Sequence, residues 1–289
     1  MGIIGRHSFE LCSRPRIISS ASYVGDKEGK GPLRECFDKI CRDDTLGLDS
    51  WEQAESRMFE SAVRVALAKI KRQSDDLSCL LGGDLLNQII SSGFAAREIR
   101  APFIGLYGAC STISEGLMLG GMLVDGGFAE LAACAASSHF SAAERQFRYP
   151  LEMGVQAVPS SQRTVTGAGS IIIQAAGEFR PGAGNVFEHV ALTGGTIGSV
   201  EDFGITDANN MGAAMAPAAF KTIKTHLSDY SRRVEDYDRI ITGDLGIFGS
   251  DMLYELLRGE GIEIADRHED CGKLMFSPEQ NVNCGASGC

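Results

Sequence analysis

One order of segments occurs twice in this chain, 160 residues apart. A helical stretch begins at Trp51, and a short apolar strand then leads to a Gly-Asp-Leu turn at Asp84. A second helical stretch begins at Met211, and a second strand leads to a Gly-Asp-Leu turn at Asp244, with the same spacing of 33 residues. We interpret the two copies as an internal duplication of one structural unit. Two unrelated units within one ordinary α/β sheet are the alternative.

The hydrophobic pattern predicts which segments form helices and strands. Ser50, with Gln53 three residues later, predicts the start of a helix that ends near Arg72. Further helices are expected over 113–124 and 211–228. Strands are expected over 77–82, 103–107, 131–137, 164–176, 186–195 and 238–242. Because most of these strands are apolar throughout, they favour an α/β fold with a central sheet covered on both faces. Residues 140–163 have no clear periodicity and predict a long loop over the surface or over a pocket.

Composition excludes several classes of protein. The chain has 289 residues, 44% of them hydrophobic, and a formal net charge of −11. This balance excludes a disordered chain and argues against a nucleic-acid-binding protein, which needs a basic face. The longest apolar or glycine run, 116–124, is much shorter than the ~20 residues of a membrane helix. The first ten residues do not resemble a secretory signal, so we expect neither a signal peptide nor a transmembrane segment.

The nine cysteines predict reduced thiols. None of them forms a Cys-x-x-Cys pair, and the number is odd. This pattern argues against both a disulfide framework and a zinc site, so we expect no metal site. Most of these residues are expected to be small buried side chains.

Cys110 is the strongest candidate for a chemical role. It follows the strand expected at 103–107 and precedes the helix expected at 113–124, with the small residues Gly108 and Ala109 allowing a sharp turn. Ser111 or Thr112 could cap that helix. A thiol at a helix N-terminus has a lowered pKa and can act as a nucleophile, and the same N–H groups can instead hold a carboxylate. A small buried residue at a crowded turn is the third interpretation.

The motif around Cys110 resembles the elbow of the thiolase-like superfamily. In that superfamily each duplicated half has a strand, an elbow and a helix, and the nucleophilic cysteine stands on the first elbow, here within GACST. Within the superfamily the chain is similar to the stage V sporulation protein AD family over residues 15–289, in the segments GPLRECFD, GDLLNQ, ERQFRYP, FGITD, MGAAMAPAA and TGDLG. The resemblance implies a five-layer αβαβα fold with halves at 1–185 and 186–289. The second half is expected to lack its final helix and strands.

The resemblance also implies a function, and the departures from it matter. The sporulation family is implied to bind dipicolinic acid, pyridine-2,6-dicarboxylate, for uptake into the developing spore. The condensing enzymes of the superfamily pair the cysteine with a histidine, and with an asparagine or a second histidine or cysteine near the second elbow. Here Gly243 and Asp244 stand where the histidine would be, and Ala286 matches the asparagine. We therefore expect a non-catalytic binding protein, because loss of one oxyanion donor alone costs ~3 kcal/mol. The alternatives are an acyltransferase that uses Cys110 and a scaffold with a vestigial pocket.

A planar dianion needs a local positive site in this acidic chain. Arginine is suited to it, because its guanidinium pairs bidentately with carboxylate and can stack on a ring. The candidate ligand-binding residues are Asp84, Cys110, Ser111, His139, Arg145 and Arg148. Each also has an ordinary interpretation: a hydrogen-bonded structural role for His139, surface ion pairs for the two arginines, and a cap or Asx turn for Asp84 and Asp244.

Partners and location follow from the resemblance. We expect no resident cofactor, although calcium could enter together with dipicolinate, which chelates it. The implied partners are other stage V sporulation A-operon proteins at the membrane and a second copy of the chain in a homodimer. The implied location is peripheral, on the spore inner membrane.

Overall fold

The computed structural model describes residues 2–148, 151, 158–177 and 190–289. A six-stranded mixed sheet forms the centre of the first half, with strand order β4-β3-β9-β7-β5-β6. β5 is parallel to β6 and β7, whereas β9 runs antiparallel to β3 and β7. Every residue of β5 and β7 is buried, which explains why their sequences are apolar or small except for Asp84 at the end of β5. The strands are β3 (Arg16–Val24), β4 (Lys39–Ile40), β5 (Cys79–Asp84), β6 (Phe103–Gly105), β7 (Leu131–Ser138) and β9 (Gly167–Gln174).

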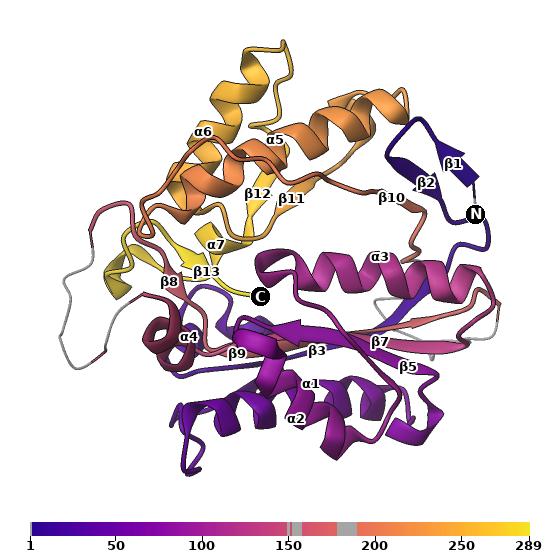
Figure 1. Ribbon diagram of the computed structural model, residues 1–289, viewed down its shortest axis with the longest axis vertical. Helices are drawn as coiled ribbons and strands as arrows, with labels where there is room; N and C mark the ends of the chain where they lie inside the picture. The colour runs from indigo at the N-terminus through magenta and orange to yellow at the C-terminus, as the bar shows by residue number, and fades with distance from the viewer. Residues whose placement is uncertain (1, 149–150, 152–157, 178–189) are drawn as a thin grey trace.

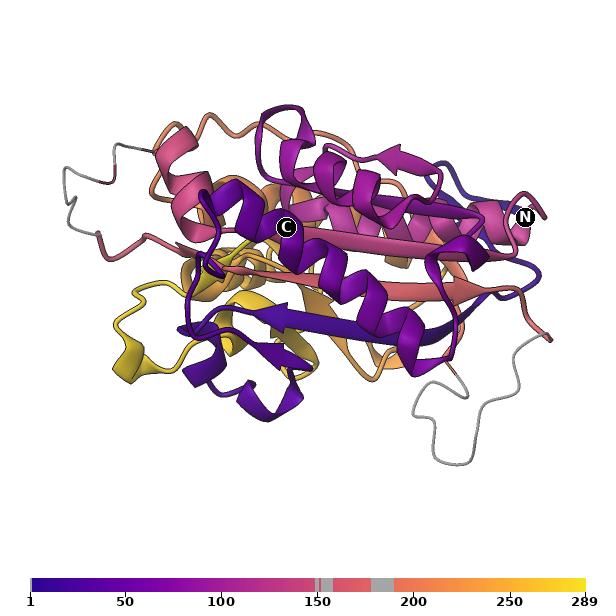
Figure 2. The ribbon, with the colours of Figure 1, turned by 90° about the horizontal axis from the view of Figure 1, so that it is seen from below.

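Helices cover both faces of this sheet. α1 (Trp51–Lys69) and α2 (Ile90–Ile99) lie on one face, and α3 (Thr112–Asp125) lies on the other (Figure 1). Seen from below, α1 crosses the strands on its own side of the sheet (Figure 2). The helix begins where the sequence predicts, because the Ser50 hydroxyl accepts a hydrogen bond from the Gln53 N–H at 3.2 Å. Met58, Phe59 and Val63 of α1 have no exposed surface and pack in the core beneath the sheet.

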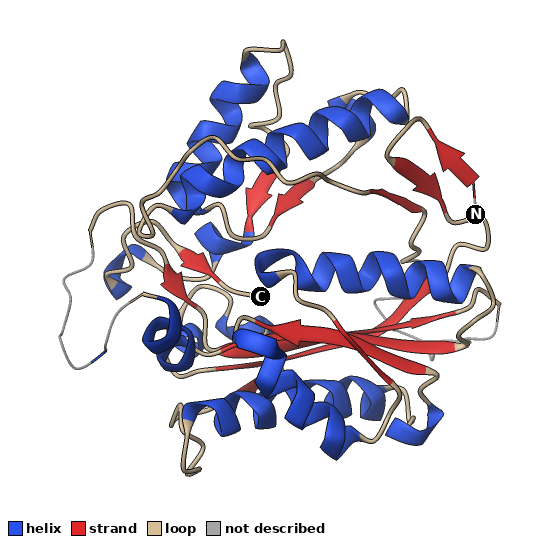
Figure 3. Cartoon of the chain, in the orientation of Figure 1, coloured by secondary structure: helices blue, strands red, loops and turns tan. Residues whose placement is uncertain are grey.

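The second half stacks on α3. A parallel pair of strands, β11 (Ile240–Thr242) and β12 (His268–Asp270), lies beneath α5 (Met211–Asp229) and α6 (Gly246–Arg258). Helices and strands therefore alternate through five layers: α1 with α2, the large sheet, α3, the β11–β12 pair, and α5 with α6 (Figure 3). This arrangement confirms the predicted αβαβα fold. The remaining elements are β1 (Gly2–Ile4), β2 (Ser8–Glu10), β8 (Arg163–Thr164), β10 (Gly194–Thr196), β13 (Ala286–Ser287), α4 (Phe140–Phe147) and α7 (Cys271–Leu274).

The structure supports the duplication in detail. α1 and α5 each have 19 residues, and α5 is capped by Asn210 as α1 is capped by Ser50, 160 positions earlier. Each helix is followed by a residue in the left-handed region, Lys71 and Ser231, again 160 positions apart. A single 3-10 turn follows in both copies, at Ser74–Asp76 and at Val234–Asp236. Agreement in caps, turns and backbone angles is what two copies of one unit should show.

One prediction about local structure is wrong, and another is correct only in part. Residues 140–147 of the expected loop 140–163 form α4, because the His139 side chain caps this segment by accepting from the Ser141 N–H at 3.2 Å. The loop's residues 149–150 and 152–157 lie outside the described residues. The strand expected at 186–195 is present only in part: Ala191 forms an isolated antiparallel bridge with Arg16 of β3, and the segment ends in β10, which pairs with β2. Residues 186–189 of that segment are also outside the described residues.

The paired caps give a stability prediction. Replacing Ser50→Ala or Asn210→Ala removes the acceptor of an orphan helix N–H, so each variant should lose about 1 kcal/mol of unfolding free energy. Urea denaturation followed by circular dichroism measures the loss. Ser56→Ala is the control, because it makes the same change inside α1, where alanine is the better helix former. Equal stability of the cap variants and the control would contradict the capping role.

Candidate functional site

Cys110 stands on a sharp turn between β6 and α3. The preceding residue, Ala109, has a φ of 46°, in the left-handed region that non-glycine residues rarely adopt. Gly108 precedes it, and an added Cβ there would lie 2.5 Å from the Glu115 carboxylate and 2.8 Å from the Ser111 hydroxyl, so these side chains would have to move. Ser111 does not cap α3 with its side chain. Its hydroxyl donates instead to the Gly108 carbonyl at 2.8 Å and fastens the turn.

The surroundings of the Cys110 thiol are acidic. The thiol donates a hydrogen bond to the Asp244 carboxylate, and the Gly288 N–H faces both groups. Burial and the Asp244 charge together raise the pKa of the Cys110 thiol to about 12. The prediction of a lowered thiol pKa is therefore wrong, because desolvation and a neighbouring carboxylate outweigh the dipole of α3. A second thiol, Cys289, donates to the Ala109 carbonyl at 3.1 Å.

The described histidines are engaged elsewhere. His226 contacts the hydroxyls of Thr196 and Tyr237, each at 2.7 Å. His268 contacts the hydroxyls of Thr242 and Tyr254, each at 2.8 Å. Within the described part of the chain, the group that hydrogen-bonds the Cys110 thiol is therefore a carboxyl group rather than an imidazole.

The Asp244 side chain can face the thiol because Asp270, and not Asp244, accepts the backbone hydrogen bond of its turn. In the first copy, Asp84 accepts from the Leu86 N–H at 2.9 Å, which closes the Gly-Asp-Leu turn. In the second copy, the equivalent N–H belongs to Gly246, 160 positions later, and it donates to Asp270 at 2.9 Å. The cap interpretation is therefore correct for Asp84 and wrong for Asp244. Burial raises the pKa of Asp244 to about 7, and the negative charge of Asp270 acts in the same direction.

Gln162 hydrogen-bonds to two segments of the second half that lie near Cys110. Its side-chain N–H groups donate to the Asp244 carbonyl at 2.7 Å and to the Ala286 carbonyl at 2.8 Å. Its own backbone carbonyl accepts from the Arg148 guanidinium at 2.9 Å. Sequence reasoning missed Gln162, because nothing in its local sequence shows that it bridges residues 82 and 124 positions away.

A buried pair of acids lies in the first half near the elbow. Glu55 and Asp84 have no exposed surface, and no cation neutralises either of them among the described residues. Burial raises the pKa of Glu55 to about 8, and the Asp84 charge adds to the shift. Serine hydroxyls donate to both groups: Ser137 and Ser91 to Glu55, and Ser92 to Asp84, which also accepts from the Leu86 N–H. A glutamate on the apolar face of the helix expected at 51–72 is the sequence signal that could have revealed this pair.

The structure does not gather the predicted ligand residues around Cys110. Asp84 is buried and satisfied by its own turn. His139 is buried, contacts the Asp44 carbonyl at 2.9 Å and caps α4. Arg148 pairs with Glu144 at 2.9 Å besides contacting Gln162.

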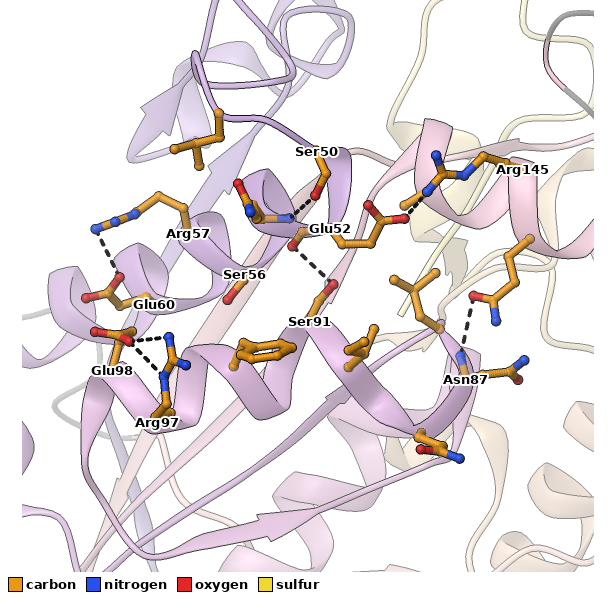
Figure 4. A pocket seen from close by; sticks show the side chains of 18 residues that line it. Ser50, Glu52, Ser56, Arg57, Glu60, Asn87, Ser91, Arg97, Glu98 and Arg145 are labelled. Atoms are coloured by element: carbon orange, nitrogen blue, oxygen red, sulfur yellow. Dashed lines mark hydrogen bonds and ion pairs between the residues drawn. The ribbon is translucent and has the colours of Figure 1, made fainter.

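Arg145 faces a different hollow. It pairs with Glu52 and stacks over the Trp51 ring with 5.0 Å to the centroid. Figure 4 shows it at one end of a groove between α1, α2 and α4, with a volume of about 1020 Å³. Arg57 and Arg97 also line this groove, and each is paired with a glutamate, Glu60 and Glu98.

In the part of the chain that the structure describes, no group of three or more His, Cys, Asp or Glu side chains is placed to hold a metal ion.

The acidic surroundings predict an unreactive Cys110. At pH 8 iodoacetamide should alkylate Cys110 much more slowly than Cys36, which is exposed on the same molecule. Asp244→Asn removes the charge and the strong acceptor, so Cys110 alkylation should accelerate by roughly tenfold for each unit by which its pKa falls. Peptide mass spectrometry measures both rates in one sample, with Cys36 as the internal control. Equal alkylation of Cys110 in both proteins would show that Asp244 does not control the thiol.

The buried Glu55 predicts a pH-dependent stability. Between about pH 4.5 and pH 8 the folded protein keeps a proton on Glu55 that the unfolded chain releases, so this residue lowers stability as the pH rises. Glu55→Gln should remove this loss. At pH 9 the variant should be more stable than the original protein by at least about 1 kcal/mol, since one pKa unit corresponds to about 1.4 kcal/mol. Urea denaturation from pH 5 to pH 9 tests this, with the exposed Glu35→Gln as control. Parallel pH profiles of the original protein and Glu55→Gln would refute the prediction.

The chain is similar in structure to OleA and to 3-oxoacyl-[acyl-carrier-protein] synthase III proteins. The OleA protein of Xanthomonas campestris bound with cerulenin superposes with a TM-score of 0.58 at 12% identity, over 89% of this chain and 81% of that one. The 3-oxoacyl-[acyl-carrier-protein] synthase III of Aquifex aeolicus superposes with a TM-score of 0.57 at 10% identity, over 94% and 87% of the two chains. At such low identity the likeness establishes the thiolase-like fold and nothing about activity.

Similarity in sequence is more specific. The chain is 43% identical over 290 residues to the stage V sporulation protein AD of Bacillus subtilis, covering all of this chain and 82% of that protein. The family model described as stage V sporulation protein AD matches residues 5–289. This chain therefore belongs to the stage V sporulation protein AD family and is a sporulation protein with a thiolase-like fold.

Proposed function

We propose that this protein is a non-catalytic receptor for dipicolinic acid that supports uptake of the acid into the developing spore. The observation that carries the proposal is the Asp244 carboxyl group beside the Cys110 thiol, in the place where a condensing enzyme has its base. The sequence resemblance to a family implied to bind this acid supplies the ligand. Other stage V sporulation A-operon proteins at the inner membrane, and a second copy of this chain, are the proposed partners.

Catalysis at Cys110 is disfavoured by its ionisation. The thiolate is the nucleophile in acyl transfer, and a thiol with a pKa of about 12 is ionised in roughly one molecule in 100,000 at pH 7. A carboxylate in contact with the sulfur holds the proton on it instead of removing it. The oxyanion that develops in acyl transfer would also be repelled by Asp244. These groups therefore suit a binding site better than a reactive one.

The same groups can receive a carboxylate when Asp244 is protonated. With a pKa of about 7, Asp244 is half neutral at physiological pH, and its O–H can then donate to a ligand carboxylate. The Gly288 N–H and the N-terminus of α3 add donors of positive polarity beside it. Arg148 supports the site indirectly through Gln162, and Ser111 through the elbow turn. Calcium, where it takes part, would arrive with the ligand.

The structure bears on how the protein could associate with a membrane. Among the described residues, none of the helices combines the length and apolar character that crossing a membrane requires. We propose that the protein is peripheral on the spore inner membrane and reaches it through its partners.

The proposal predicts binding that strengthens as the pH falls. Carboxylic acids such as dipicolinate stay ionised above pH 6, so the titrating group in this range is Asp244. Above its pKa of about 7, affinity should weaken by up to tenfold per pH unit, because an ionised Asp244 repels the dianion. Isothermal calorimetry with dipicolinate at pH 6, 7 and 8 measures this. Asp244→Asn should bind at all three pH values with nearly constant affinity, because it stays neutral.

Two controls separate the possible outcomes. Pyridine-2-carboxylate has one carboxylate and should bind more weakly than dipicolinate. Arg145→Ala changes the groove of Figure 4 and should leave dipicolinate binding unchanged, so loss of binding in that variant alone would move the site to the groove. Absence of heat with a folded protein would refute the proposed function. A stable acyl adduct on Cys110 after incubation with acyl-CoA, seen as an intact mass increase, would favour an acyltransferase.

A further inference from the structure

Three arginines converge on a recess away from the elbow. The recess lies where α1 and α2 end, beside the 3-10 turn Ser74–Asp76, and has a volume of about 500 Å³. Arg64 of α1, Arg72 after α1 and Arg100 after α2 line it. Guanidinium groups that line one recess can contact the same bound anion.

Two of the arginines are held in place by the protein. The Arg64 guanidinium donates to the Glu60 carboxylate at 2.8 Å and to the Glu98 carbonyl at 2.9 Å. Arg72 has a longer ion pair with Asp76, at 3.6 Å. These contacts fix donors that remain partly exposed toward the recess.

Arg100 is the arginine without a counter-charge. It ends α2 in the left-handed region, with a φ of 63°, and its N–H bonds the Ala96 carbonyl at 2.9 Å. Across the described residues its guanidinium makes no ion pair or hydrogen bond. Two carboxylates also line the recess, Asp75 and Glu98, and Glu98 is paired with Arg97 at 2.8 Å. Because Glu60 and Asp76 pair with Arg64 and Arg72, Arg100 is the one of the three arginines whose guanidinium has no partner among the described residues.

The second copy of the duplicated unit shows what the first has changed. The positions 160 residues after Arg64 and Arg100 are Lys224 and Glu260. These two form an ion pair at 2.9 Å between α5 and the end of α6. In the second copy the acid that pairs with this helix cation is at position 260, whereas in the first copy Arg64 pairs with Glu60 and the position equivalent to 260 is Arg100. The first copy therefore carries a cation at the helix end where the second copy carries an acid.

We propose that this recess binds a phosphate group. A phosphate carries up to two negative charges and several oxygens, so several guanidinium groups can contact it at once. A single carboxylate has two oxygens, and one bidentate arginine can pair with both of them. The phosphate could belong to a soluble phosphate ester or to the headgroup of an anionic phospholipid. The inference is independent of dipicolinate binding, because it uses none of the residues at the elbow.

The two copies also supply the test variant. Arg100→Glu places at position 100 the residue type that the second copy has at position 260, so the protein should still fold. Its phosphate affinity should fall by about tenfold or more, as expected when a charged hydrogen bond is replaced by repulsion. Arg100→Gln is a second variant that removes the charge without adding another. Arg34→Glu is the control, because it makes the same charge change at an exposed residue outside the recess.

Two measurements distinguish the sources of phosphate. Thermal unfolding is recorded in inorganic phosphate and in chloride at equal ionic strength, and phosphate should raise the melting temperature of the original protein and of Arg34→Glu more than that of Arg100→Glu, which shows only the general effect of the salt. Sedimentation is then measured with phosphatidylcholine vesicles, with and without phosphatidylglycerol. A lipid headgroup is identified if the protein sediments with the vesicles only when phosphatidylglycerol is present. This co-sedimentation should also be lost in Arg100→Glu and be reduced by inorganic phosphate. A specific rise in melting temperature with phosphate, without co-sedimentation with vesicles, identifies a soluble ester. If the original protein and both Arg100 variants respond alike in both measurements, the proposal is wrong.

Discussion

The contact between the Cys110 thiol and the Asp244 carboxylate joins the two halves of the molecule at its centre. Cys110 comes from the elbow before α3, and Asp244 comes from the turn after β11. The position of Asp244 depends on neighbours that hold its backbone, above all Gln162, which also fixes Ala286. Much of the second half is therefore organised to present one carboxyl group to one thiol.

That contact is unfavourable in isolation, which is why it is informative. Burying a carboxyl group without a cation raises its pKa and lowers stability, and the effect occurs twice around the elbow, at Glu55 and at Asp244. A chain under selection for stability alone would replace such groups by apolar ones. Strongly shifted carboxyl groups gather at functional sites, and here they surround the residue that the fold places on its elbow.

The sequence predicts the parts of this arrangement that depend on local signals. The cap at Ser50, the buried strands and the turn before Cys110 follow from residue types over a few positions, and all are present. The errors come from contacts between distant segments. Arg145 and Arg148 suit a dianion by type, but their partners are fixed by α4, a helix whose start depends on a histidine cap that the periodicity does not reveal. The thiol pKa also requires knowledge of Asp244, 134 positions away, since a helix N-terminus alone predicts a shift in the opposite direction.

Duplication explains how Asp244 became available. In both copies a backbone N–H after the Gly-Asp-Leu turn needs an acceptor, and in the first copy Asp84 provides it. In the second copy Asp270 of β12 accepts from that N–H and from the Leu245 N–H at 3.0 Å. Because Asp270 accepts the hydrogen bonds of the turn, Asp244 is not needed as a local acceptor, and its side chain can face the other half. A site between two copies of one unit can thus arise without new backbone structure, because a single added acceptor releases a side chain that the first copy still uses to hold its own turn.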